Sequence, residues 1–346
     1  MKVAVVCPYA FDSPGGVQDQ VRRIVSWLCD EGHVAWAVAP GEGGPPGTRS
    51  VGGFQEIRAN RSRAPITLDP RAASAVAKAT AEADVVHVHE PFMPVVGPAA
   101  VLGSGPPVVG TFHADPSRLV RAVYKGTAGL LRRVVDRMSA VTAVSPVAAS
   151  AVEHLTDLQV VPNGIDLEMY APGVDRVPGR VVFLGRDDPR KGLDVLLQGW
   201  PLVMSEQPDA SLVVVGAERE SGPAGVRFAG RLSEEEKISE LGAATTLVAP
   251  NLGGESFGIV VLEGMAAGCA IVASDIPAFR HVAGDAARFA PPGDPTALAE
   301  AIASTLTEPG LAASMAARGG LQAKRFGRDA VLGGYLDAYR TGTAGA

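Results

Sequence analysis

The 346-residue chain has few cysteines, and they lie far apart. Its three cysteines, Cys7, Cys29 and Cys269, include no C-x-x-C pair. A disulfide-stapled fold is therefore excluded, and the sparse count is typical of a reducing compartment. At roughly 150 residues per domain, the length predicts about two domains, each large enough to bury its own core.

A secretion signal and long apolar runs are also missing. The apolar run at residues 1–6 is ended by Pro8 and Asp12, so it is shorter than the core of a signal peptide. No apolar stretch approaches the ~18 residues of a membrane-spanning helix. We therefore expect a cytoplasmic protein without membrane spans.

The charge balance lacks the basic excess of a nucleic-acid-binding protein. Lysine and arginine number 31 against 37 aspartates and glutamates, which gives a formal net charge of −6. We therefore expect no nucleic-acid partner. The segment 113–138 departs from this balance, because its only acids are Asp115 and Asp136. Its six cations are Arg118, Arg121, Lys125, Arg132, Arg133 and Arg137.

Short apolar runs alternate with helical patterns along both halves of the chain. In the first half the expected strands are 3–7, 34–39, 85–89, 108–111 and 140–144. In the second half they are 180–184, 211–215, 226–229, 246–249, 270–273 and 288–290. This pattern is typical of parallel sheets covered by helices. Two such arrays predict an α/β protein with two doubly wound, Rossmann-like domains.

Turn-forming residues separate the two arrays. Pro162, Asn163 and Gly164 are followed by further prolines and glycines, which places the boundary near residues 165–178. We predict an N-terminal domain of residues 1–168 and a C-terminal domain of residues 169–327. The final helical segment, 328–346, can pack on either domain, including back on the first.

Both halves have an anion-binding pattern after a strand. Gly15 and Gly16 precede a helix, where backbone N–H groups can approach an anion, although a plain turn is the alternative. Arg186 and Lys191 follow the strand at 180–184, and two cations at a strand's carboxyl end suit a diphosphate. No G-x-G-x-x-G follows the first strand, which disfavours a nicotinamide-dependent oxidoreductase.

The glycine-rich segment 250–258 opens a helix in the second half. Its glycines let backbone amides meet an anion at the helix start. Glu255 and Glu263 are eight residues apart, so they need not share a face, and they could contact different hydroxyl-bearing parts of one ligand. Alternatively, the negative charge of Glu255 only stabilises the N-terminus of the helix through its dipole.

Three histidines, His87, His89 and His113, lie on or at the end of two expected strands. With Glu90 they suggest a metal site, but their spacing matches no metal signature. We therefore predict no metal ligands and expect hydrogen-bonded histidines, with His113 facing the site. No Ser-His-Asp set and no pair of carboxylates suited to a glycosidic bond is evident.

These motifs resemble the retaining GT-B glycosyltransferases of family 4 over nearly the whole chain. The residues that carry the resemblance are Gly185-Arg186, Arg190-Lys191-Gly192, Gly254-Glu255-Ser256-Phe257-Gly258 and Glu263-Gly264-Met265-Ala266-Ala267-Gly268. Residues 6–18, His89-Glu90-Pro91 and Thr111-Phe112-His113 narrow it to members that transfer the first mannose from GDP-mannose to phosphatidylinositol. The resemblance implies an acceptor-binding first domain facing a nucleotide-sugar-binding second domain across a cleft.

The resemblance also implies a role for each candidate residue. The catalytic group is His113, Arg186, Lys191 and Glu255. The donor-binding group is Gly16, Arg186, Lys191, Glu255, Ser256, Phe257, Gly258 and Glu263, with the ribose on Glu263. The acceptor-binding group is Tyr9, Gln18, Asn60 and Arg63. No enzyme nucleophile is implied, because the leaving diphosphate accepts the acceptor's proton on the same face of the sugar.

The implied enzyme is a hexosyltransferase of the EC 2.4.1 type with no tightly bound cofactor. Mg²⁺ at most stimulates the reaction, and we expect no protein ligands for it. The nearest alternative keeps this chemistry with another nucleotide-sugar donor and a different lipid, glycan or small-molecule acceptor. A two-domain sugar-binding protein without catalysis is a third interpretation, but such a protein would need a signal peptide.

An anionic phospholipid acceptor implies contact with the inner face of the plasma membrane. Family members use a Lys/Arg-rich helix for this contact, whereas residues 71–78 here carry only Arg71 and Lys78. On a helical wheel, Arg118, Arg121, Lys125 and Arg132 instead share one side of an amphipathic segment. Such a segment indicates a membrane-contact surface, or an ordinary helix with a solvated face.

Overall fold

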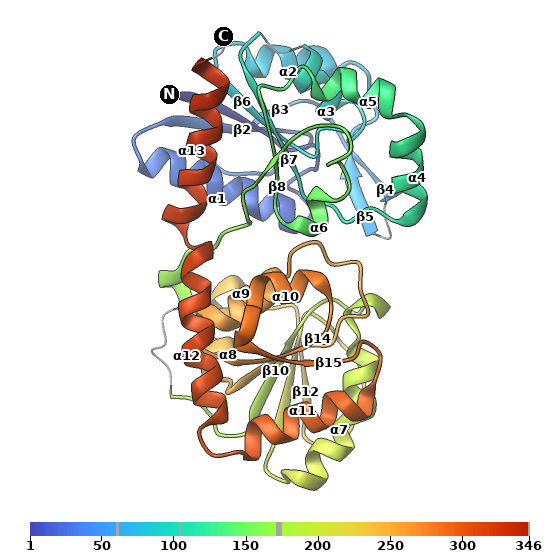
Figure 1. The fold of residues 1–346 in the computed structure, drawn as a ribbon, viewed down its shortest axis with the longest axis vertical. Helices are drawn as coiled ribbons and strands as arrows, with labels where there is room; N and C mark the ends of the chain where they lie inside the picture. The colour runs from blue at the N-terminus through green and yellow to red at the C-terminus, as the bar shows by residue number, and fades with distance from the viewer. Residues whose placement is uncertain (60–61, 104, 171–174, 345–346) are drawn as a thin grey trace. The chain divides into compact units, whose positions relative to one another are not determined.

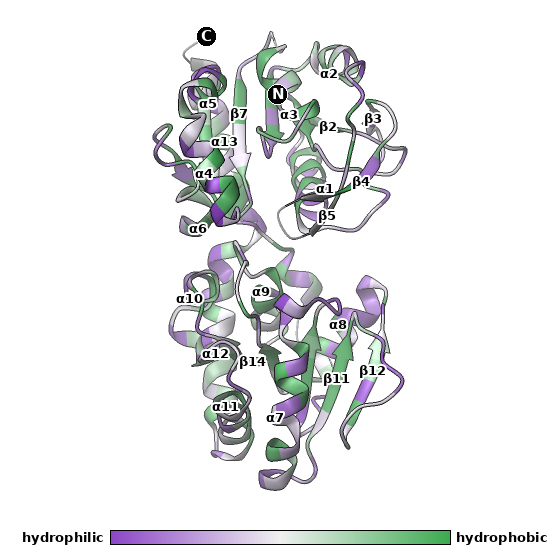
Figure 2. Cartoon of the chain, turned by 90° about the vertical axis from the view of Figure 1, so that its right-hand side faces the viewer, coloured by the Kyte–Doolittle hydropathy of each residue, from purple (hydrophilic) through white to green (hydrophobic). Residues whose placement is uncertain are grey.

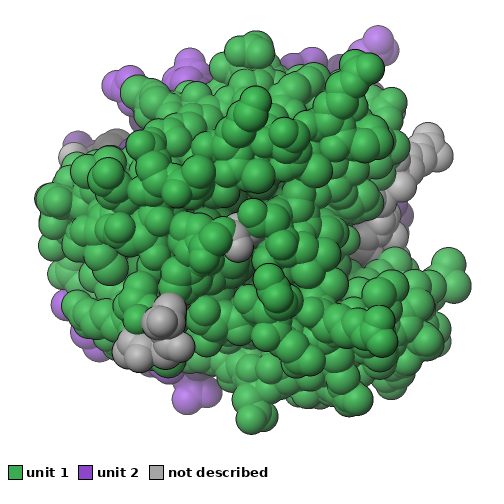
Figure 3. All heavy atoms as spheres, turned by 90° about the horizontal axis from the view of Figure 1, so that it is seen from above, with its two compact units in different colours: residues 1–164, 328–346 green, residues 165–327 purple. Residues whose placement is uncertain are grey.

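The computed structural model describes residues 1–59, 62–103, 105–170 and 175–344. The chain forms two compact units (Figure 3). Unit 1 consists of residues 1–164 and 328–346, and unit 2 consists of residues 165–327. The chain thus enters unit 2 a few residues before the division suggested by the sequence, and its last helix belongs to unit 1.

Unit 1 contains a seven-stranded sheet with the order β3-β2-β1-β6-β7-β8-β9. All of its neighbouring strands pair in parallel. The strands are β1 (Lys2–Val6), β2 (Val34–Ala39), β3 (Arg49–Ser50), β6 (Val85–His89), β7 (Val108–Phe112), β8 (Ala140–Ala143) and β9 (Gln159–Val160). The strand order reverses between β1 and β6, and open α/β sheets bind ligands beyond the carboxyl ends of the strands at such a point.

Helices and one antiparallel hairpin complete unit 1 (Figure 1). The helices are α1 (Gly16–Asp30), α2 (Ala72–Thr80), α3 (Val96–Leu102), α4 (Arg118–Gly126), α5 (Ala128–Val135), α6 (Pro146–Ala149) and α13 (Arg328–Ala344). The hairpin strands are β4 (Gln55–Ala59) and β5 (Ser62–Ile66). Helix α13 packs against α1 and against strands β6 to β8, so the two ends of the chain share one unit.

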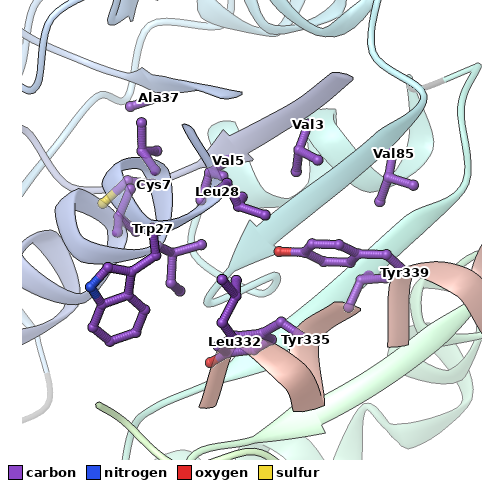
Figure 4. Packing of buried hydrophobic residues seen from close by; sticks show 14 of the residues in the cluster. Val3, Val5, Cys7, Trp27, Leu28, Ala37, Val85, Leu332, Tyr335 and Tyr339 are labelled. Atoms are coloured by element: carbon purple, nitrogen blue, oxygen red, sulfur yellow. The ribbon is translucent and has the colours of Figure 1, made fainter. Parts of the chain in front are cut away.

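The core of unit 1 lies between the sheet and the helix pair α1 and α13 (Figure 4). Strand β1 contributes Val3 and Val5, helix α1 contributes Trp27, and helix α13 contributes Tyr335 and Tyr339. All five side chains are buried. Since burial of a large apolar side chain contributes about 1.5–3 kcal/mol, α13 is an integral part of this core.

Unit 2 contains a six-stranded sheet with the order β12-β11-β10-β13-β14-β15, again parallel throughout. The strands are β10 (Arg180–Leu184), β11 (Ser211–Val215), β12 (Val226–Gly230), β13 (Thr246–Ala249), β14 (Ala270–Ser274) and β15 (Ala287–Ala290). The order reverses between β10 and β13. Figure 2 shows the strongly apolar β11, as expected for a strand of a sheet covered by helices.

The helices of unit 2 cover this sheet. They are α7 (Leu193–Glu206), α8 (Glu234–Ala243), α9 (Ile259–Ala266), α10 (Pro277–Ala283), α11 (Pro295–Thr307) and α12 (Leu311–Ala323). Short 3₁₀ turns lie at η1 (Leu167–Tyr170), η2 (Pro189–Lys191), η3 (Gly284–Ala286) and η4 (Lys324–Phe326). Helices α7 and α11 pack on the core around the fully buried Trp200.

The structure confirms the predicted class of two Rossmann-like α/β domains. The eleven predicted strands all form, with ends shifted by one residue at most. The short strands β3 and β9 and the β4–β5 hairpin are additions. The continuous amphipathic helix assumed across residues 118–138 is wrong, because α4 ends at Gly126 and Thr127 leaves helical geometry with φ −108° and ψ 16°.

Replacing Gly199 of α7 by alanine is expected to destabilise unit 2, although alanine within a helix is about 0.5–1 kcal/mol more favourable than glycine. A Cβ at Gly199 would lie 2.4 Å from the carbonyl oxygen of Pro295 in α11. Such overpacking costs about 1–3 kcal/mol. The matched control is Gly320→Ala in α12, where no atom lies within 4 Å of the added Cβ. Urea denaturation followed by circular dichroism should show opposite shifts for the two variants, and a stabilised Gly199→Ala protein would contradict this packing.

Candidate active site

Two loops of unit 2 meet where its strand order reverses. One follows β10 and runs to Gly192, and the other follows β13 from Pro250. Gly192 has a φ of +71°, and a Cβ there would lie only 1.9 Å from the carbonyl oxygen of Pro250. The backbone N–H of Leu252 donates to the carbonyl of Arg190 at 2.8 Å. The glycine is therefore required both for its left-handed conformation and for the close approach of the loops.

A pocket of about 240 Å³ opens beside these loops. Its lining residues are Leu184, Gly185, Arg186, Lys191, Val215, Gly216, Arg231, Leu232, Lys237, Val260 and Glu263. Four of these side chains are cationic and one is acidic, so the pocket has an excess of positive charge. The side chains of Arg186 and Arg231 form no hydrogen bond or ion pair with the described residues. Their guanidinium groups are thus available to an anion, for which arginine's fork geometry is well suited.

Lys191 and Glu255 connect the two loops by an ion pair. The ammonium group of Lys191 contacts Oε1 of Glu255, and the side-chain amide of Asn251 donates to the same oxygen at 2.8 Å. Both charged side chains are about one-fifth exposed, so the cost of desolvating the two charges offsets much of their mutual attraction. An anionic ligand in the pocket would compete with Glu255 for Lys191, which would free carboxylate oxygens to accept other hydrogen bonds.

Glu263 of α9 is a buried carboxylate with two donors. Its Oε1 accepts from the ammonium of Lys237 at 2.8 Å and from the hydroxyl of Tyr170 at 3.0 Å. Lys237 also pairs with Glu234 at 2.8 Å. Burial lowers the pKa of Lys237, but the charges of Glu263 and Glu234 outweigh this effect and raise the pKa above its usual value. Glu263 is therefore held as an oriented hydrogen-bond acceptor at the pocket wall.

The segment before α9 presents backbone amides rather than side chains. Gly258, with a φ of +104°, is the N-cap of α9 and supplies no side-chain cap. The first N–H groups of the helix consequently remain open to an anion. Phe257 is buried, and its ring packs edge-on against Phe326 at 5.6 Å between centroids. Any ligand contact by Phe257 would thus come from its backbone.

The corresponding point in unit 1 lies at the ends of β1 and β6. Gly15 caps α1 without a side-chain hydrogen bond, and Gly16 has open space where a Cβ would be. Gln18 is buried, and its amide nitrogen donates to the carbonyls of Ala10 and Ser13 at 3.2 and 3.1 Å. Gln18 therefore holds the loop that shapes the start of α1.

Glu90 and Tyr9 lie together at this edge. Oε1 of Glu90 accepts from the backbone N–H groups of His113 and Ala114, both at 2.7 Å. Burial raises the pKa of Glu90 to about 7, although the two amides oppose the shift. Burial, with the charge of Glu90 as the second cause, raises the pKa of Tyr9 well above 10. Glu90 also has a φ of +49°, and such strain tends to occur at functional sites.

The three predicted histidines are buried and hydrogen-bonded. His87 contacts the hydroxyl of Tyr339 at 2.8 Å and that of Thr111 at 2.6 Å. Nδ1 of His89 lies 2.6 Å from Nε2 of His113. Burial lowers the pKa of both His87 and His113 to about 3, so both are neutral at pH 7. Among the described residues, no group of three or more His, Cys, Asp or Glu side chains is arranged to hold a metal ion.

Asn60 lies outside the described residues. Arg63 lies in β5, where its backbone is opposite Arg58. Within the described ranges, no helix has the length and apolar character needed to cross a membrane.

The predicted membrane-contact cations differ in their surroundings. Arg121 pairs with Asp115 at 2.7 Å, and Arg132, on α5, donates to the carbonyl of His154 at 2.9 Å. Arg118 and Lys125 are exposed, and neither side chain bonds to a described residue. Helix α4 has no buried residue. The apolar side chains that α4 and α5 expose most are Leu119 at 75%, Leu130 at 63% and Val123 at 52%.

Comparison with known proteins agrees with this arrangement. Residues 14–169 match the family described as Glycosyltransferase Family 4, and residues 178–308 match Glycosyl transferases group 1. A phosphatidyl-myo-inositol mannosyltransferase of Mycolicibacterium smegmatis is 37% identical, over 99% of this chain and 94% of the relative. One of Propionibacterium freudenreichii is 37% identical, over 82% of this chain and 80% of the relative.

Solved structures show the same fold. The crystal structure of Anabaena Alr3699/HepE in complex with UDP and glucose has a TM-score of 0.76 at 18% identity, covering 99% of this chain and all of that one. The fold and the two family matches therefore define a GT-B glycosyltransferase. The chain belongs to glycosyltransferase family 4 and is a nucleotide-sugar-dependent enzyme of the EC 2.4.1 type.

The two residues that orient Glu263 were not predicted from the sequence. Lys237 and Tyr170 bond to Glu263 from segments far away in the sequence. The sequence does contain a signal for the start of α8, since Ser233 and Glu236 form a capping box. That signal places Lys237 in the first turns of a helix, but it does not reveal which carboxylate the lysine meets.

Replacing Arg186 by glutamine is expected to weaken binding of GDP or UDP about 10- to 100-fold, since a hydrogen bond to a charged group contributes about 1.5–3 kcal/mol. Arg190→Gln is the matched control, because Arg190 pairs with Asp188 at 2.8 Å and does not line the pocket. Isothermal titration calorimetry measures both variants. Equal losses in the two would show that the pocket is not the diphosphate site.

Proposed function

We propose that this enzyme transfers mannose from GDP-mannose to phosphatidylinositol, with retention of anomeric configuration, at the cytoplasmic face of the membrane. The observation that carries the proposal is the cationic pocket of unit 2, in a chain that is similar over nearly its full length to phosphatidyl-myo-inositol mannosyltransferases. The three free cysteines support a reducing compartment.

In this proposal unit 2 binds the donor. Arg186 and Lys191 hold the diphosphate, whose leaving charge is then stabilised by fixed donors. Glu263 accepts hydrogen bonds from the ribose, and its orientation by Lys237 and Tyr170 supports that role. Glu255 accepts hydrogen bonds from hydroxyls of the sugar once the diphosphate has replaced it as the partner of Lys191. The backbone amides of Ser256, Phe257 and Gly258 complete the phosphate contacts.

Retention follows from attack on the side of the leaving group. The leaving diphosphate accepts the proton of the inositol hydroxyl as the new bond to the anomeric carbon forms. The contacts of Glu90 and Glu263 support a mechanism without an enzyme nucleophile, because each carboxylate is already bonded to N–H or ammonium donors. Catalysis then rests on positioning and on charge stabilisation, with His113 contacting the sugar near the reacting carbon.

Unit 1 binds the acceptor. Tyr9, the loop that Gln18 holds, Asn60 and Arg63 form the proposed surface for the inositol phosphate. Helix α4 supplies the membrane contact through Arg118 and Lys125, with Leu119 and Val123 entering the lipid interface. The absence of any buried residue on α4 supports this assignment, because its apolar side chains have no place in the core of the unit.

The decisive assay combines the purified enzyme with GDP-mannose or UDP-glucose and with phosphatidylinositol or phosphatidylcholine vesicles. We expect a mannosylated lipid by mass spectrometry only with GDP-mannose and phosphatidylinositol together, and an α-linkage by NMR. Transfer from UDP-glucose, or to an acceptor other than phosphatidylinositol, would replace this proposal by another family 4 activity. An inverted linkage would exclude the same-side mechanism.

The paired substitution Arg118→Gln with Lys125→Gln is expected to weaken binding to anionic vesicles about 10- to 30-fold, at about 1 kcal/mol for each cation near the surface. Vesicle sedimentation with phosphatidylglycerol measures this effect without the substrate lipid. Arg71→Gln with Lys78→Gln removes the same charge from α2 and serves as the control. Losses confined to the α2 pair would place the membrane contact on α2 instead.

A further inference from the structure

A row of three buried histidine rings in unit 1 ends at His113. The ring of His89 lies 4.3 Å from that of His87 and 4.9 Å from that of His113, centroid to centroid. His87 is itself fixed by hydrogen bonds to Tyr339 of α13 and Thr111 of β7. His89 therefore has a fixed position from which its Nδ1 meets Nε2 of His113 at 2.6 Å.

Only one proton can lie in this contact. Burial lowers the pKa of His113 to about 3 and that of His89 well below its usual value, so both rings are neutral at pH 7. Each neutral ring has one N–H and one acceptor nitrogen. Either His89 donates from Nδ1, or His113 donates from Nε2.

The other nitrogen of His89 distinguishes the two arrangements. His89 is fully buried, and its Nε2 has no hydrogen-bond partner among the described residues. If His113 donated, His89 would carry its proton on Nε2 and bury an N–H group without an acceptor. If His89 donates, it buries only an unused lone pair. Orphaned buried N–H groups are rarer than orphaned acceptors, so donation by His89 is favoured.

We propose that His89 is a positioning residue: its Nδ1–H donates to Nε2 of His113, which places the single proton of His113 on Nδ1 and makes that nitrogen a hydrogen-bond donor to a substrate oxygen. Nδ1 of His113 has no hydrogen-bond partner among the described residues. The carboxylate of Glu90 fixes the backbone at His113, because it accepts hydrogen bonds of 2.7 Å from the N–H groups of His113 and of Ala114. The inference rests on the proposed function, in which His113 contacts the sugar.

The tautomer can be measured without any substrate. In the ¹⁵N-histidine-labelled enzyme, long-range ¹H–¹⁵N spectra at pH 7 should show His113 and His89 neutral, with both protons on Nδ1. The His89→Leu variant removes the donor and should shift the His113 signals toward the Nε2–H form. His113 protonated on Nε2 in the unaltered enzyme would overturn the inference.

Kinetics then test whether the tautomer serves transfer. His89→Leu should lower kcat about 10- to 100-fold with little change in the KM for the donor, as for an interaction made chiefly in the transition state. His89→Asn retains a donor near the position of Nδ1 and should recover kcat to within about threefold of the unaltered enzyme. Thr142→Val is the control, because it removes a buried hydrogen bond of the same network, to Thr111, away from His113.

Two further results separate this inference from the proposed function. An unchanged kcat in His89→Leu, at equal folded fraction, would overturn the positioning role. Absence of mannose transfer by the unaltered enzyme would instead reject the proposed function, and the NMR measurement would still decide the tautomer. Equal losses of kcat in His89→Leu and Thr142→Val would reduce His89 to a structural residue.

Discussion

Each unit depends on a parallel sheet whose strand order reverses once. The strands are buried between helices, so most of their residues are apolar, and most of the candidate site residues lie in the loops and helix starts that follow them. The buried histidines of β6 are the exception. At the reversal the two flanking loops leave in opposite directions and expose backbone N–H groups and side chains to a ligand. This single constraint places Lys191 beside Glu255 in unit 2, and Tyr9 beside Glu90 in unit 1.

Glycine geometry lets the two loops at the reversal in unit 2 approach each other closely. The loops after β10 and β13 can touch only because Gly192 carries no Cβ against Pro250. Their contact brings a lysine from one loop to a glutamate on the other, and it leaves Arg186 without such a partner. Part of the positive charge of the pocket is thus neutralised within the protein. Exchange of a carboxylate for a phosphate at Lys191 would therefore change the charge balance less than burial of an isolated cation.

Much of this arrangement could be predicted from the sequence. Short apolar runs between helical patterns located the strands, and residues at their carboxyl ends identified the sites, because in a parallel sheet these positions share one edge. Pairings between distant segments could not be predicted. The contact of Lys237 with Glu263, and that of His89 with His113, depend on how helices and strands pack. The break at Thr127 was also missed, since a helical wheel assumes a continuous helix.

The apolar side chains of the amphipathic helix α4 do not face the core of unit 1. An apolar stripe normally faces the core of its own domain, and burial of that stripe provides most of the stability of a short helix. Here Leu119 and Val123 are exposed, and the helix contacts its unit mainly through Arg121, Tyr124 and the adjoining α5. The free energy of burying these apolar groups is therefore not used in folding. It remains available for contact with an apolar phase outside the protein. The neighbouring cations Arg118 and Lys125 favour a phase with an anionic surface.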